Sequence, residues 1–252
     1  LRANAEQQLL ALGNLGPLLG RKARLGHLRC RKGIGHFRHS FARRLNVQGA
    51  LSVVDTDLDG LPDVFAGYRV LQISDLHLDA GRPAATQLFV RLLDGRARQA
   101  DALYVLGDLF EAWIGDDDTE PSYAGVRTAL RQCVHSGTPV MVMRGNRDFL
   151  LGQAYADEAG LQLLPEAQVV DLYGRPTLLL HGDTLCTDDL EYQAVRAQTR
   201  DPAWQSHVLS MSIEERVEMA RSARDASMAH TGNTAADIMD VNQAAVEAAM
   251  AR

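Results

Sequence analysis

Residues 69–79, RVLQISDLHLD, combine a short apolar segment with two polar side chains placed where that segment ends. Residues 69–74 are largely apolar and β-prone, which is typical of a strand inside a sheet. Asp75 and His77 then stand two positions apart, and side chains two apart in extended backbone point the same way. Open α/β sheets hold their sites at the carboxyl ends of strands. Taken alone, the pair fits a metal site and an ordinary turn equally well.

Strand-like and helix-like segments alternate after residue 69, which predicts a mixed α/β sheet with helices on its faces. The stretch 190–230 contains helical segments, especially 212–229, that we expect to form a cap instead of continuing the sheet. The other expected strands are 101–106, 139–143 and 176–180, and the other expected helices are 83–100, 121–136, about 151–160, and 235–251.

Each expected strand ends in a residue of the metal-ligand type: Asp75 with His77, then Asp108, Asn146 and His181. The intervals of 33, 38 and 35 residues are each close to one β-α-β unit. Such spacing can return all of these side chains to the same edge of one sheet. A glycine adjoins three of the four clusters, which allows close approach of the backbone. The pattern favours a metal site over a structural accident.

The ligand types narrow the choice of metal. Carboxylate, amide oxygen and imidazole without thiolate favour Mn²⁺, Mg²⁺, Fe²⁺ or Zn²⁺, and Cys186 is better explained as a small core residue. A single carboxylate that bridges two ions about 3.5–4 Å apart can support attack of hydroxide on a phosphoryl group. Asp108 is the expected bridge because it lies between the other ligands in sequence.

The order of these motifs resembles that of the calcineurin-like metallophosphoesterases, and the resemblance covers residues 69–252. Longer strings resemble the branch of that family that hydrolyses UDP-2,3-diacylglucosamine. These strings exceed what metal ligation demands, so the resemblance is specific. They are LGDLFEAWIGDDD (106–118), GNRDFLLG (145–152), HGDTLCTDD (181–189) and IMDVNQ (238–243).

The resemblance implies an α/β calcineurin-like sandwich with a helical cap at about 190–230. It implies that Asp75, His77 and Asp108 hold one Mn²⁺, and that Asp108, Asn146 and His181 hold a second. Catalysis would rest on Asp108, Asn146 and Arg147. The residues implied to contact substrate are Asn146 and Arg147 at the diphosphate, and Asp189 and Ser227 at the glucosamine.

The implied reaction cleaves the diphosphate of UDP-2,3-diacylglucosamine to UMP and 2,3-diacylglucosamine 1-phosphate, a step of lipid A biosynthesis. Acyl chains would be received by the cap, so the enzyme would work in the cytoplasm as a peripheral protein on the inner membrane. The alternatives are another calcineurin-like phosphoesterase, or a truncated relative with little or no activity.

Departures from the family pattern give further expectations. A Gly-His-x-His run, with one imidazole for each metal, would follow the last helix, and the sequence ends at Arg252 before it. We therefore expect the metallophosphoesterase domain, residues 69–252, to be incomplete at its C-terminus, to bind metal weakly and to hydrolyse poorly. Thr231 and Thr234 stand near cap positions that are polar or basic in the family. The first residue is Leu, which favours a fragment or a processed chain.

Residues 1–68 form a different kind of segment. Residues 1–44 carry ten Lys/Arg against one acid, whereas 45–252 carry 16 basic and 31 acidic residues. We expect a basic, loosely ordered extension, with a transit-like or anion-binding segment as the alternative. Nucleic-acid binding is disfavoured because aromatic residues are not interleaved and the body is acidic. His36 and His39 are better explained by a solvated turn than by a metal pair.

Other conspicuous residues receive ordinary interpretations. Residues 55–63 resemble the start of a calcium loop, but Ala66 stands where the bidentate Glu is needed, so a polar turn is favoured. Residues 116–118 are expected to be a solvated loop, and Trp113 and Trp204 packing residues. Asp148 and Asp183 are expected to orient ligands. Three scattered cysteines predict no disulfide framework and a reducing compartment.

Overall fold

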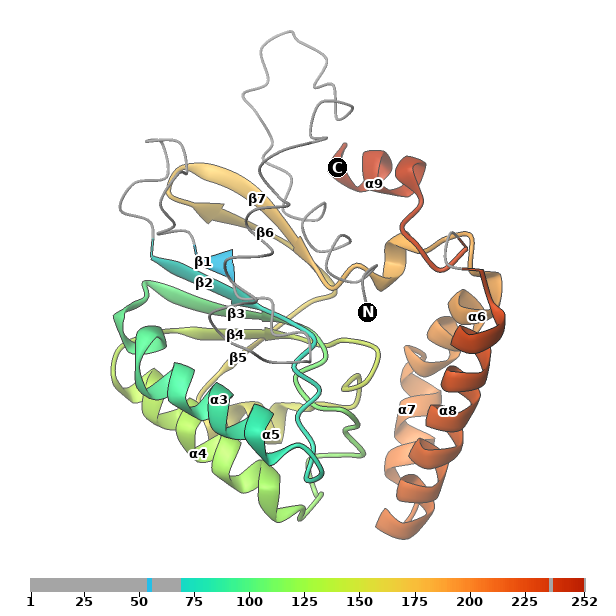
Figure 1. Cartoon of the computed structure of the whole chain (residues 1–252), viewed down its shortest axis with the longest axis horizontal. Coiled ribbons are helices and arrows are strands. Elements are labelled where there is room, and N and C mark those ends of the chain that lie inside the picture. The colour runs from blue at the N-terminus through green and yellow to red at the C-terminus, as the bar shows by residue number, and fades with distance from the viewer. Residues whose placement is uncertain (1–53, 56–68, 236–237, 252) are drawn as a thin grey trace, which may run out of the picture.

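The structure is a computed structural model that describes residues 54–55, 69–235 and 238–251 (Figure 1). Most of the basic extension lies outside the described residues, and so do His36 and His39. The calcium-like stretch also lies outside them, except for Asp55, which is part of a short strand.

A five-stranded sheet is the centre of the fold, with its strands in the order β1-β2-β3-β4-β5. Strands β2 to β5 are parallel, and β1 is antiparallel to β2. Every residue of β2, β3 and β4 is buried, as expected for parallel strands covered on both faces. The strands are β1 (Val54–Asp55), β2 (Val70–Ile73), β3 (Ala102–Leu106), β4 (Val140–Met143) and β5 (Gln162–Leu164).

Three helices cover one face of this sheet (Figure 1). They bury Phe89, Leu130 and Tyr155 in a cluster that also contains Leu103 and Val142 of the strands. Proline occupies the first turn of two of these helices, where its missing N–H has no partner to lose. The helices are α3 (Pro83–Asp94), α4 (Pro121–His135) and α5 (Gln153–Ala159).

The second face is covered by a separate antiparallel pair, β6 (Ala167–Leu172) and β7 (Arg175–Leu180). Leu179 packs from this pair onto Tyr104 and Met143 of the first sheet. The outer face of β7 packs against α9 (Gln243–Met250) through Leu178, Leu180 and Val246. The layers are therefore helix, sheet, sheet and helix, which confirms the expected α/β sandwich.

Helices α6 (Leu190–Thr199), α7 (Pro202–Leu209) and α8 (Ile213–Asn233) stand beside the sandwich (Figure 1). We call these three helices the cap. Helix α8 begins with a capping box between Ser212 and Glu215. Most of its residues are exposed or half-buried, and Arg216 is its only buried residue among those described.

Several expectations about the elements were wrong. The strand expected at 176–180 is β7, which lies outside the five-stranded sheet, and the partner β6 was not foreseen. The helix expected at 83–100 ends at Asp94, because Gly95 breaks it before a 3-10 turn at Arg96–Gln99. The helix expected at 235–251 covers only Gln243–Met250, because Asn242 caps it with its side chain.

None of the helices in the described ranges combines the length and the apolar character that a membrane-spanning segment needs.

Candidate metal centre

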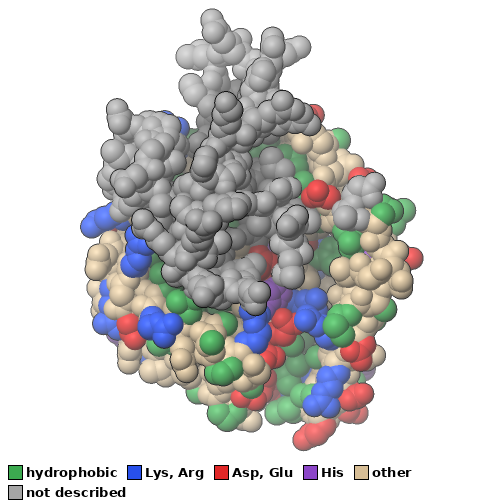
Figure 2. Space-filling model, in the orientation of Figure 1, with side chains coloured by type: hydrophobic (Ala, Val, Ile, Leu, Met, Phe, Trp, Pro, Cys, Tyr) green, Lys and Arg blue, Asp and Glu red, His purple; other side chains and the backbone are tan. Residues whose placement is uncertain are grey.

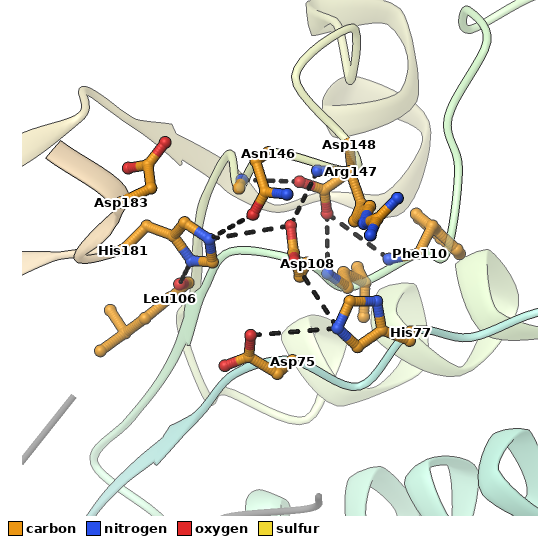
Figure 3. A network of polar contacts seen from close by, with 12 residues as sticks. Asp75, His77, Leu106, Asp108, Phe110, Asn146, Arg147, Asp148, His181 and Asp183 are labelled. Atoms are coloured by element: carbon orange, nitrogen blue, oxygen red, sulfur yellow. Dashed lines mark hydrogen bonds and ion pairs between the residues drawn. The ribbon is translucent and has the colours of Figure 1, made fainter. Parts of the chain in front are cut away.

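Asp75, His77 and Asp108 converge beyond the carboxyl ends of β2 and β3 (Figure 3). One ligand atom from each lies within 4.8 Å of the others. His77 Nε2 is 3.9 Å from Asp75 Oδ1 and 3.6 Å from Asp108 Oδ2. Both carboxylates are buried, and His77 is half-buried. The three side chains thus form a compact group of oxygen and nitrogen donors.

The backbone of these three residues is in the left-handed region, with φ of 52° at Asp75, 48° at His77 and 53° at Asp108. Such a conformation is uncommon for residues other than glycine and costs of order 1–3 kcal/mol for each residue. Backbone hydrogen bonds between the two segments hold it: Asp75 N–H donates to Gly107 O, and His77 N–H donates to Asp108 O. The strain is concentrated at the side chains that converge.

Asn146 and His181 lie on the other side of Asp108, after β4 and β7. His181 Nε2 is 3.0 Å from Asn146 Oδ1 and 3.8 Å from Asp108 Oδ1 (Figure 3). His181 Nδ1 is 2.8 Å from the carbonyl oxygen of Leu106, which can only accept, so Nδ1 carries the proton. In the neutral ring Nε2 therefore presents its lone pair toward two oxygens.

Two glycines are required by this close packing. A side chain at Gly107 would collide with the His181 ring, and one at Gly145 would collide with the Asp108 carboxylate. Gly107 also has a φ of 95°, which side chains rarely allow.

Asp148 is fully buried and accepts hydrogen bonds from the backbone N–H groups of Gly145, Leu109 and Phe110. It ties the loop after β4 to the segment after β3. Two of these backbone groups stand next to Asp108 and Asn146 in sequence, and the orientation of ligands by Asp148 stays a prediction.

Burial and neighbouring charges shift the pKa values of the group. Burial raises the pKa of Asp108 to about 6. Burial would lower the pKa of His181, but the carboxylates of Asp108, Asp183 and Asp75 outweigh it and raise that pKa to about 9. The pKa of His77 is also raised, because Glu111 and Asp108 outweigh burial. The site therefore favours bound positive charge.

These residues fit a pair of divalent ions. Oxygen and nitrogen atoms of Asp75, His77 and Asp108 face one another on one side of Asp108, and those of Asn146 and His181 face one another on its other side. The raised pKa values of His77 and His181 show that the carboxylates hold a positive charge there, and a divalent ion would take the place of the proton at each Nε2. Asp108 directs Oδ2 toward His77 and Oδ1 toward His181, so it could bridge two ions. Oxygen and imidazole donors without thiolate match the metals expected from the sequence.

The residues expected to contact substrate are only partly brought together. Arg147 donates its backbone N–H to Asp108 Oδ1 at 2.9 Å and its guanidinium N–H to Ser227 Oγ at 3.3 Å. Ser227 lies on α8, so the cap reaches the rim of the site. Asp189 is buried within the cap, where it caps α6 and pairs with His230 at 2.9 Å.

Sequence reasoning missed the carboxylates that attach the cap. Asp117 pairs with Arg216, and Asp116 accepts hydrogen bonds from the backbone N–H groups of Gly152 and Tyr155. These contacts correct the expectation that residues 116–118 form only a solvated loop. Asp183 accepts from Arg196 of α6 at 2.8 Å. No local spacing in the sequence signals these pairs: Asp183 and Arg196 are 13 positions apart, and Asp117 and Arg216 are 99 positions apart.

Glu111 was also missed, and it contacts both His77 and Arg224 of α8. Figure 2 shows charged side chains gathered where the sandwich meets the cap. The boundary of the two parts is thus polar and lies beside the group of donors.

Comparisons with known proteins agree with this arrangement. A family model described as calcineurin-like phosphoesterase matches residues 68–245. A Stenotrophomonas maltophilia (strain K279a) protein named UDP-2,3-diacylglucosamine hydrolase is 58% identical over 159 residues, which are 63% of this chain and 64% of that relative. A relative of the same name from strain R551-3 is 52% identical over 189 residues, 72% of this chain and 76% of its own length.

A Xanthomonas campestris pv. campestris (strain B100) protein, also named UDP-2,3-diacylglucosamine hydrolase, is 57% identical over 159 residues, 63% of this chain and 64% of its own. The match thus spans somewhat less than two thirds of the length of some of these relatives. The model match, the sandwich and the convergent donors lead to one conclusion: the chain belongs to the calcineurin-like phosphoesterase family.

Proposed function

We propose that this chain carries the two-metal centre of a hydrolase that cleaves the diphosphate of UDP-2,3-diacylglucosamine to UMP and 2,3-diacylglucosamine 1-phosphate. The observation that carries the proposal is the position of Asp108, whose two oxygens face His77 and His181 on opposite sides. The printed names of the relatives at 50–58% identity support the choice of substrate. The pathway would be lipid A biosynthesis.

The proposed ligands are Asp75, His77 and Asp108 for one ion, and Asp108, Asn146 and His181 for the other. Two such ions would supply the charge that polarises a phosphoryl group and activates water. Manganese is the proposed metal, because Mn²⁺ accepts mixed carboxylate, amide and imidazole donors.

Arg147 is the proposed contact to the diphosphate. A guanidinium can donate two parallel hydrogen bonds to phosphate oxygens. Its backbone N–H is already fixed on Asp108, so the side chain starts at the rim of the centre. The side-chain amide of Asn146 has its oxygen toward His181, which leaves its N–H donors for the same phosphate. Water would attack the α-phosphorus, and the lipid 1-phosphate would leave.

We propose that the cap receives the acyl chains. An open pocket on α8 is lined by Met211, Met219, Ala223 and other residues. Large apolar side chains on the cap are exposed, among them Leu190 (76%) and Met228 (55%). Apolar exposure of this kind suits work at the cytoplasmic surface of the inner membrane, where Asp189 and Ser227 are proposed to contact the sugar.

The test is an assay of the purified chain with MnCl₂ and UDP-2,3-diacylglucosamine, with release of UMP measured by chromatography. The expected result is metal-dependent UMP release that is lost in Asp108→Asn. Asp171→Asn, near the end of β6, serves as the control because its side chain accepts from the backbone N–H of Gly174 in the turn to β7 and is not part of the centre.

A generic phosphodiester is assayed in parallel. Its metal-dependent hydrolysis without UMP release would point to another calcineurin-like phosphoesterase and reject the proposed substrate. Neither activity, together with no Mn²⁺ binding by calorimetry, would reject the two-metal centre itself.

A further inference from the structure

Glu111 is a carboxylate next to the metal centre that is not itself one of the proposed ligands. Glu111 lies in the segment that follows β3, and its backbone N–H donates a hydrogen bond to the carbonyl oxygen of Leu78 at 3.0 Å. An isolated parallel bridge between Leu78 and Phe110 fixes the same two segments side by side. Glu111 is therefore held across from His77 by backbone contacts and not only by its side chain.

The two carboxylate oxygens of Glu111 face different partners. Oε2 lies 3.1 Å from His77 Nδ1. Oε1 forms an ion pair with Arg224 of helix α8. Glu111 and His77 are both only 20% exposed at the side chain, whereas Arg224 is 42% exposed. One carboxylate thus connects an imidazole of the metal centre with the cap.

The contact matters when a metal ion lies at Nε2 of His77. Nε2 faces Asp75 and Asp108, and it can ligate a metal only through its lone pair. The ring proton must then stand on Nδ1, the nitrogen beside Glu111. A carboxylate that holds the second nitrogen of a ligating histidine fixes both its tautomer and its orientation.

We propose that Glu111 is a positioning residue of the metal centre: it holds the His77 ring with Nε2 directed toward Asp75 and Asp108, and Arg224 holds Glu111 in place. The proposal rests on the proposed function for the metal, but the orientation of the His77 ring is a property of the metal-free protein. The metal site would accordingly depend on the docking of α8, although no cap residue is among the metal ligands.

The first experiment measures Mn²⁺ affinity by isothermal titration calorimetry. Glu111→Ala is expected to weaken binding about 10–100-fold, the usual effect of losing such a partner. Glu111→Gln keeps an acceptor oxygen and is expected to recover most of that loss. Glu158→Ala is the matched control. Glu158 also pairs with an arginine, Arg127 at 2.6 Å, but it is 59% exposed and lies on helix α5, away from the metal centre.

The second experiment measures the orientation of the His77 ring by NMR without metal, from nuclear Overhauser contacts of its carbon-bound hydrogens. The ring signals are assigned by their absence in His77→Gln. The wild type and Glu111→Gln are expected to show one ring orientation, and Glu111→Ala more than one. Thermal unfolding of the variants is measured in parallel, so that a loss of overall stability is recognised separately.

A double-mutant cycle tests the part played by Arg224. Arg224→Ala is expected to weaken Mn²⁺ binding less than Glu111→Ala, and the double variant is expected to equal Glu111→Ala alone. Arg221→Ala is the control, since Arg221 lies one turn earlier on α8, is 73% exposed and pairs only with Glu218 among described residues.

The outcomes separate the two proposals. Unchanged affinity and an unchanged ring orientation in Glu111→Ala would overturn the role of Glu111, and fully additive effects would overturn that of Arg224. If the wild type binds no Mn²⁺, yet Glu111→Ala still changes the orientation of the His77 ring, the metal function fails and the positioning of His77 stands.

Discussion

Arg216 of helix α8 donates hydrogen bonds to both carboxylate oxygens of Asp117, at 2.7 and 2.5 Å, although the two residues are 99 positions apart. The arginine side chain is 3% exposed and the aspartate 60%. Arg216 also donates to the carbonyl oxygen of Ile114 at 2.7 Å. The cap is therefore anchored on the loop that follows Asp108, by a cation that is almost wholly removed from water.

Removal of Asp117 should loosen this anchor more than removal of the arginine. Asp117→Ala leaves a buried guanidinium without its charge partner, and a hydrogen bond to a charged group contributes about 1.5–3 kcal/mol. Arg216→Met keeps most of the buried volume and strands no buried charge, so we expect a smaller loss.

Urea unfolding of the full chain measures both effects. Asp94→Ala is the control, because its ion pair with Arg98 is exposed, and pairs of that kind contribute about 0–1 kcal/mol. Equal destabilisation by Asp117→Ala and Asp94→Ala would contradict the anchor.

Substitution by alanine should be harmful at Gly145, where it should weaken Mn²⁺ binding, and favourable at Gly125, where it should raise the stability of the protein. Gly145→Ala would drive a methyl group into the Asp108 carboxylate and its backbone, so Mn²⁺ affinity should fall at least about tenfold. A methyl group at Gly125, within α4, meets no atom within 4 Å, so Gly125→Ala should stabilise the protein by about 0.5–1 kcal/mol. Calorimetry and thermal unfolding of both variants check the pair. Tight Mn²⁺ binding in Gly145→Ala would argue against the packing at Asp108.

The strands that carry Asp75, Asp108 and Asn146 could be predicted from the sequence, because each is a short apolar run that ends in a glycine or polar cluster. The convergence of their side chains followed from the carboxyl-end rule for parallel strands. His181 was expected at the same edge of the five-stranded sheet, yet it follows β7, a strand of the second sheet. Periodicity does not specify which sheet a strand joins, and β6, whose residues alternate between exposed and half-buried, gives a weak apolar signal.

The contacts of the cap could not be predicted in the same way. Asp117 and Glu111 carry no local signal that distinguishes them from solvated acids. Their partners are arginines on α8, a helix with a single buried residue among those described. Pairing of this kind depends on how two distant elements pack, and charge patterns along one segment do not encode it.

The pH dependence of the cap should follow His230. Its Nε2 lies 2.9 Å from Asp189 Oδ2 and its Nδ1 lies 3.1 Å from Glu191 Oε2. The hydrogen bond with Asp189 raises the pKa of His230 above its ordinary value. A raised pKa means that the folded state binds the proton more tightly than the unfolded state. The resulting stability is complete below the unfolded pKa of about 6.5 and is lost as the pH rises through the folded pKa.

Comparison with His230→Gln isolates this effect, because glutamine does not titrate. The wild type should exceed the variant in urea midpoint at about pH 5.5, and the difference should shrink toward about pH 9. His207→Gln, on the exposed side of α7, is the control. A difference that is constant with pH would show that the His230 contacts do not depend on its charge.

Arg147 should affect substrate turnover without affecting the metal. Its backbone N–H, which holds Asp108, is present whatever the side chain, so Arg147→Ala should leave Mn²⁺ affinity unchanged by calorimetry. Loss of the guanidinium removes a donor to the diphosphate, and kcat/KM for UMP release should fall about 10²–10³-fold. Arg147→Lys should recover only part of this loss, because an ammonium group lacks the paired donors of a guanidinium. If Mn²⁺ affinity fell together with kcat/KM, Arg147 would act through the metal centre and not on the phosphate.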